Sequence, residues 1–128
     1  MSRRFVALAA LALCGLGACA KQIEAPADRG VCWHMVPLAG GKFKYNRVAQ
    51  NVDRLEKCAA ELEGMRRRFL ALGGSNREIN GAYQGQFLFL TQQGIFTATN
   101  YYGGRYLLLV PTDDGRLVRP GLQGQSAQ

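Results

Sequence analysis

Residues 52–72 read VDRLEKCAAELEGMRRRFLAL. At 100° per residue the apolar side chains of this stretch fall on one stripe, which is the pattern of an amphipathic helix resting on an apolar surface. The stripe consists of Leu55, Cys58, Ala59, Leu62, Met65, Phe69 and Leu72. Asn51 is the expected N-cap and Gly73 the expected stop. The stretch therefore predicts one long helix over residues 52–72.

The polar side of this helix carries mixed charges. Asp53 with Lys57, and Glu63 with Arg67, have the i,i+4 spacing of weak helix-stabilising ion pairs. Arg67 and Arg68 are conspicuous on this side, and two interpretations remain open. They form either a solvated face or a contact with anionic lipid headgroups.

Short β-rich runs flank the helix. Those before it are 31–37 and 42–48, and those after it are 86–91, 95–99, 105–111 and 116–118. Glycine-containing gaps between the runs are typical of hairpin connections, and Asn80-Gly81 is a further turn candidate. We expect an α+β fold in which one amphipathic helix packs on a strongly bent antiparallel sheet of about five to six short strands.

The middle strands are apolar on both faces. Phe87 and Phe89 alternate with Leu88 and Leu90, so both faces of their sheet need a cover. One helix covers only one face. Either the sheet curls with the first hairpin folding over, which we expect, or a partner, a second copy or a lipid-like ligand covers the other face.

The first twenty residues have the features of an export signal. Two arginines, Arg3 and Arg4, precede a charge-free stretch from Phe5 to Ala20, which is the pattern of a secretory signal peptide. The stretch is short for a spanning helix, which needs about 20 apolar residues.

Within this signal, Leu16-Gly17-Ala18-Cys19 resembles the lipobox of bacterial lipoproteins. The resemblance implies a diacylglycerol on the Cys19 thiol, cleavage before that residue and acylation of its new amino group. It also implies sorting to the outer membrane, since Ala20 follows, with the inner membrane still open. A soluble secreted protein, cut after Ala18 or Ala20, is the alternative.

These features divide the chain into four parts. We expect a lipoprotein signal peptide at 1–18, a lipidated cysteine and tether at 19–30, a single α+β domain at 31–120 and a flexible tail at 121–128.

Two cysteines remain for the folded domain. Cys14 leaves with the signal and Cys19 takes the lipid, so Cys32 and Cys58 are expected to form a disulfide in an oxidising compartment. A redox pair or two metal-ligating thiols are the alternatives, although the CxxC spacing and clustered histidines typical of such sites are missing from the sequence.

Residues suited to catalysis are few. The single histidine, His34, lies in an expected strand beside a tryptophan, and Ser75 and Ser126 lie in expected loops. Asp113 and Asp114 are neighbours in a turn, where capping of the turn is the simplest interpretation. We therefore expect a protein that is not an enzyme and has no metal or cofactor.

The remaining candidates concern binding. Tyr101, Tyr102, Arg105 and Tyr106 surround a Gly-Gly turn, and exposed tyrosine and arginine at a loop tip are typical of contact sites. The alternative is that the tyrosines cap the edge of the core. Loss of Arg3 and Arg4 with the signal leaves 14 basic and 9 acidic residues, a net charge of +5 that favours anionic partners.

Together these observations predict a membrane-anchored, periplasm-facing lipoprotein that acts as a non-enzymatic interaction or envelope-structural module. Its expected partners are the membrane, an envelope protein or a second copy of itself, and not nucleic acid. The alternative is a lipoprotein that binds a small hydrophobic ligand, a lipid or a glycan.

Overall fold

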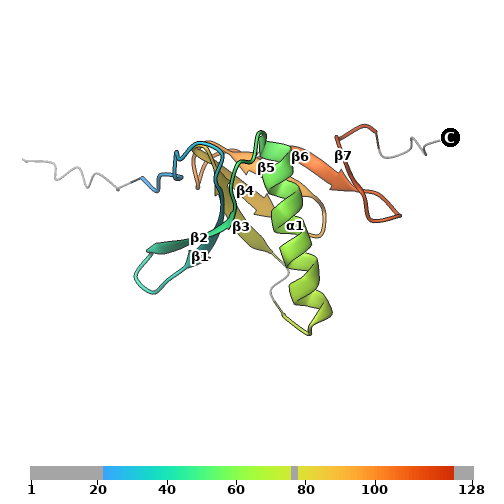
Figure 1. Ribbon diagram of the computed structural model, residues 1–128, viewed down its shortest axis with the longest axis horizontal. Coiled ribbons are helices and arrows are strands. Elements are labelled where there is room, and N and C mark those ends of the chain that lie inside the picture. The colour runs from blue at the N-terminus through green and yellow to red at the C-terminus, as the bar shows by residue number, and fades with distance from the viewer. Residues whose placement is uncertain (1–21, 76–77, 123–128) are drawn as a thin grey trace, which may run out of the picture.

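The computed structural model describes residues 22–75 and 78–122, which contain one helix and seven strands. The elements in chain order are β1 (Cys32–Pro37), β2 (Phe43–Ala49), α1 (Leu55–Ala71), β3 (Ile79–Tyr83), β4 (Gln86–Leu90), β5 (Ile95–Ala98), β6 (Tyr106–Pro111) and β7 (Leu117–Val118). All strand pairs are antiparallel, in the order β2-β1-β3-β4-β5-β6-β7, and α1 crosses one side of the sheet (Figure 1). The predicted α+β class is confirmed, but the strand count is higher than the five to six expected.

The additional strand is β3, where a turn was predicted at Asn80-Gly81. The turn lies four residues later, at Gln84 and Gly85, which have φ angles of 44° and 81° and join β3 to β4. Gly81 is a glycine for a different reason. A Cβ at this position would lie 2.3 Å from Leu62 Cδ1, so the absence of a side chain lets α1 approach β3 closely.

The predicted helix is present but shorter at its N-terminal end. It begins at Leu55, and the N-cap position is Arg54, whose side chain makes no capping hydrogen bond. Asn51 has a φ of 55°, so the prediction of Asn51 as N-cap was wrong. The predicted stop is confirmed, because Gly73 takes a φ of 89° directly after the C-cap residue Leu72.

The first face of the sheet packs on α1. Its core includes Leu62 of α1, Ile79 of β3 and Leu88 and Leu90 of β4. The predicted disulfide between Cys32 and Cys58 is confirmed: it joins β1 to α1, and both cysteines are fully buried. Helix and sheet are thus joined covalently near the N-terminal ends of α1 and β1.

The second face of the sheet is covered by the chain itself. Its buried centre is Met35, Phe87, Phe89 and Ala98. The side chains packed against this centre are Ile23, Ala25, Phe43, Tyr45, Phe96 and Tyr101. Phe43 and Tyr45 come from the first hairpin, as the expected folding over of that hairpin requires.

Ile23 and Ala25 belong to the segment expected to be a tether at 19–30. In the described part of that segment, from Gln22 onward, the backbone is bound to the hairpin between β3 and β4. The Gly85 amide donates to the Pro26 carbonyl at 2.9 Å, and the Gly30 amide donates to Gln84 Oε1 at 2.8 Å. Residues 22–30 are therefore part of the folded domain, and the predicted boundary at residue 31 lies too late.

Candidate functional site

An open cavity lies where the described chain begins. It has a volume of about 250 Å³ and is lined by Gln22, Ile23, Asn100, Tyr101, Tyr102 and Gly103. The loop after β5 thus lies next to the N-terminal segment (Figure 1). We call residues 100–103 the tyrosine loop.

Two tyrosines of this loop have different environments. The Tyr101 ring lies 5.2 Å from Phe43, 5.5 Å from Phe87 and 5.7 Å from Phe89, measured between centroids, so it closes the second face of the sheet. Tyr102 packs edge-on against Tyr101 at 4.9 Å and is 86% exposed. Tyr101 therefore fixes the loop to the core, and Tyr102 is presented to the outside.

The other two predicted binding residues lie apart from this cavity. Arg105 places its guanidinium carbon 3.5 Å from the Phe89 ring centroid and forms an ion pair with Glu78 at 3.6 Å. Tyr106 is 72% exposed and pairs with Thr97, on the opposite face from Tyr101 by strand alternation. Tyr101 and Arg105 thus contact aromatic rings of the second face, whereas Tyr102 and Tyr106 have largely exposed rings on different sides.

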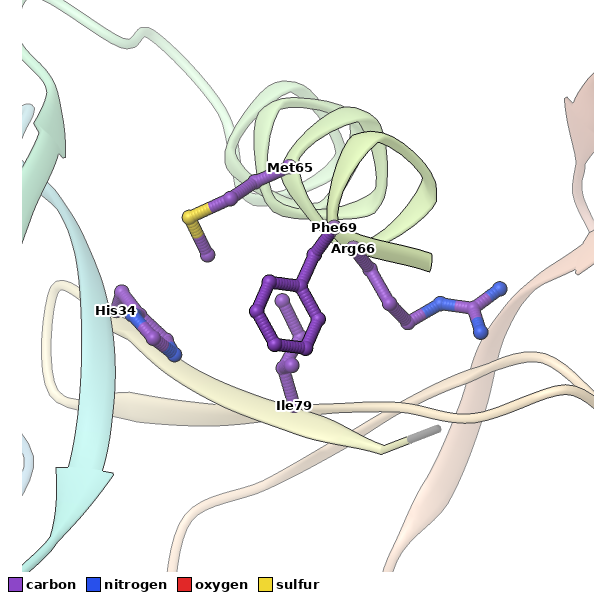
Figure 2. A pocket seen from close by; sticks show the side chains of 5 residues that line it. All are labelled: His34, Met65, Arg66, Phe69 and Ile79. Atoms are coloured by element: carbon purple, nitrogen blue, oxygen red, sulfur yellow. The ribbon is translucent and has the colours of Figure 1, made fainter. Parts of the chain in front are cut away.

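A second hollow lies between α1 and the sheet. It has a volume of about 120 Å³ and is lined by His34, Met65, Arg66, Phe69 and Ile79. Figure 2 shows the His34 ring, the Met65 methyl group and the Phe69 ring around this space, with the Arg66 guanidinium directed away from it. We call it the histidine pocket, and its walls are mainly apolar.

His34 is half-buried at the edge of this pocket, and burial lowers its pKa below the ordinary value of 6.5. The neutral imidazole is therefore favoured. Arg66 is buried with Glu63, to which it donates two hydrogen bonds of 2.8 and 2.7 Å. The predicted pair of Glu63 with Arg67 was wrong, because the i,i+3 pairing with Arg66 lets both groups satisfy each other at the buried edge of α1.

The predicted headgroup contacts lie elsewhere. Arg67 donates to the Gly115 carbonyl at 3.2 Å, and Arg68 is exposed in the last turn of α1. In Figure 1 this end of the helix lies far from residues 22–30. The predicted ion pair of Asp53 with Lys57 is confirmed at 2.7 Å, and the hydrogen bond from Lys57 lowers the pKa of Asp53.

The adjacent acids after β6 have the predicted structural role in part. Asp114 accepts hydrogen bonds from the Thr112 hydroxyl and, at 2.7 Å, from Arg116 Nε. These contacts lie within the turn between β6 and β7. The hydrogen bond from Thr112 is the main cause that lowers the pKa of Asp114.

Cys19 lies outside the described residues, as does the rest of the predicted signal peptide. Within residues 22–75 and 78–122, no cluster of three or more His, Cys, Asp or Glu side chains is arranged to hold a metal ion. In the same ranges, no helix has the length and hydropathy needed to cross a membrane.

Comparison with protein-family models, curated proteins and solved structures finds no match. Sequence reasoning missed Gln22 and Ile23 as neighbours of the tyrosine loop. The only local signal was the alternation of Ile23 and Ala25, which is too short to distinguish a packed segment from a linker.

Proposed function

We propose that this chain is a lipid-anchored protein of the bacterial envelope, facing the periplasm, whose domain acts as a non-enzymatic binding module. The observation that carries this proposal is the position of the lipobox-like Leu16–Cys19. It ends three residues before Gln22, and the next residue, Ile23, already packs on the core of the domain. An acylated Cys19 would then hold the domain directly at the membrane surface. The lipobox resemblance implies that this surface is the inner leaflet of the outer membrane.

The second face of the sheet supports a binding module over a carrier of a lipid-like ligand. That face is filled by the chain's own side chains, with Phe87 and Phe89 at its centre and Tyr101 over them. The histidine pocket, at about 120 Å³, is small beside ligand pockets of about 300–1,000 Å³. It is better suited to an inserted side chain.

The end of α1 is the surface that we assign to a protein partner. Leu72 is 88% exposed and Phe69 is 46% exposed beside the histidine pocket. This end lies away from the N-terminal segment (Figure 1), so it would remain accessible on an anchored protein. Exposed apolar side chains next to a pocket are typical of contact surfaces.

Fatty-acid labelling of growing cells tests the anchor. We expect an alkyne-bearing palmitate to label the wild-type protein and Cys14→Ala but not Cys19→Ala. Mass spectrometry of the N-terminal peptide should place the acyl groups on residue 19. An unlabelled wild-type protein that retains its first eighteen residues would refute the proposed anchoring.

Photo-crosslinking in cells tests the binding module. A photoreactive amino acid at position 72 should give a discrete adduct with one envelope protein or with a second copy of the chain. The same amino acid at the exposed position Asp113, on the turn between β6 and β7, is the matched control. Equal patterns at both positions would contradict a partner surface at the end of α1.

A further inference from the structure

The tyrosine loop and the beginning of the described chain form one surface. Gln22, Ile23, Tyr101 and Tyr102 line the same open cavity. Ile23 and Tyr101 also pack on the buried centre of the second face, so the loop and the N-terminal segment are held beside each other by a common core. Whatever lies next to Gln22 therefore also lies next to Tyr102.

The covalent chain limits how far this surface can be from a lipid on Cys19. Three residue steps separate Cys19 from Gln22, and a fully extended chain of that length spans at most about 11 Å. The polar layer on each side of a bilayer is about 5–7 Å deep. An acylated Cys19 consequently keeps Gln22 within about 11 Å of the lipid attachment, so the tyrosine loop on the same cavity lies close to the headgroups.

We propose that Tyr102 inserts into the headgroup layer of the phospholipid bilayer and orients the anchored domain. This inference rests on the proposed lipidation of Cys19 and deepens it. A tyrosine suits this layer because its ring is apolar and its hydroxyl forms hydrogen bonds with headgroups. Tyr102 is 86% exposed and is supported from behind by Tyr101 at 4.9 Å.

The support from Tyr101 matters for the energetics of insertion. Tyr101 is itself held by three phenylalanine rings, so the loop is ordered before it meets the membrane and loses little conformational freedom on contact. With the membrane on this side, the apolar end of α1 points away from the bilayer and toward a partner.

A chemically tethered protein tests the inference independently of natural lipidation. The chain from Cys19 to Gln128 contains three cysteines, and the disulfide of Cys32 with Cys58 leaves only the Cys19 thiol free. This thiol is coupled to a maleimide lipid in vesicles of phosphatidylcholine and phosphatidylglycerol. Tyr102→Trp is the reporter, and the wild-type chain provides the background from Trp33.

We expect the Tyr102→Trp emission to shift to shorter wavelength on the vesicles and to lose intensity when the phosphatidylcholine carries brominated acyl chains. Leu72→Trp is the matched control, since Leu72 is 88% exposed and lies at the far end of α1. Its emission should neither shift nor be quenched.

Three results would overturn the inference. These are an unquenched Tyr102→Trp, equal quenching at positions 72 and 102, and a shift of Tyr102→Trp that depends on protein concentration without vesicles. The last result would assign the surface to a second copy of the chain. Because the tether is synthetic, none of these results tests natural acylation of Cys19. That proposal is tested separately by fatty-acid labelling.

Discussion

Replacement of both bridged cysteines by alanine should destabilise the domain strongly. Cys32 and Cys58 are separated by 26 residues, and closing a loop of this length lowers the entropy of the unfolded chain by an amount worth about 3.5 kcal/mol at 25 °C. Typical domains are stable by about 5–15 kcal/mol in total. For a domain of this size the expected loss corresponds to a fall in Tm on the order of 20 °C.

Urea unfolding followed by far-UV circular dichroism measures this loss. The oxidised wild-type protein is compared with Cys32→Ala/Cys58→Ala, and both are repeated with a reductant. The reductant should lower the stability of the wild-type protein to near that of the double variant and leave the variant unchanged. A difference below about 1 kcal/mol between the oxidised proteins would refute the reasoning, because it lies far below the stabilisation that loop closure predicts for this loop.

Three further predictions concern the interface between α1 and the sheet. Gly81→Ala should destabilise the domain by about 1–3 kcal/mol in urea unfolding, because the new Cβ would meet Leu62 Cδ1 at 2.3 Å; a neutral effect would contradict this close approach. Glu63→Gln should destabilise the domain by about 1.5–3 kcal/mol, because it removes the charge that accepts two short hydrogen bonds from Arg66. Glu63→Leu/Arg66→Leu should cost less, because it removes both charges together; equal losses would contradict a buried pair. Burial lowers the pKa of His34 in the folded state, so the unfolded chain binds more protons just below pH 6.5. The free energy of unfolding should therefore fall on acidification through that region. His34→Gln should lose this part of the pH dependence. A pH profile identical in wild type and His34→Gln would exclude such a contribution.

The helix and the disulfide could be predicted because each produces a local pattern. Cys58 lies on the apolar stripe of the helix, so a bond from Cys32 to that stripe is consistent with helix packing on sheet. The start of the helix could not be predicted in the same way. Asn51 is a favourable N-cap by type, but the Val52 amide donates to the Gly30 carbonyl at 2.9 Å, and this tertiary contact holds the chain in a turn before Leu55.

The strand β3 was missed because the same two residues fit two structures. Asn80-Gly81 is a strong turn signal when only neighbours along the chain are considered. Gly81 instead meets Leu62, nineteen positions earlier in the sequence, and that contact decides its structure. The turn formed at Gln84-Gly85, where Gln84 takes a positive φ that is uncommon for its residue type.

The candidate site shows the same limit more clearly. The local sequence does not distinguish Tyr101 from Tyr102, because both are tyrosines directly before a Gly-Gly turn. Their roles separate through contacts that Tyr101 makes with Phe87 and Phe89 of β4 and with Phe43 of the first hairpin, whose ring lies 5.2 Å away. An aromatic contact between such distant residues leaves no periodic signal, so the division into a partly buried supporting ring and an exposed ring required the structure.

A sheet with two apolar faces needs two covers, and this chain obtains them from different parts of its sequence. The helix covers one face under a disulfide, whereas the second face depends in part on Ile23 and Ala25 in the segment that leads to Cys19. Under the proposed anchoring, the same residues that close the core also set the position of the domain on the membrane. Ile23 is partly buried on that face and lines the same cavity as the tyrosine loop. A force applied through a lipid on Cys19 would therefore act first on the cover of the second face, while the disulfide keeps α1 on the other.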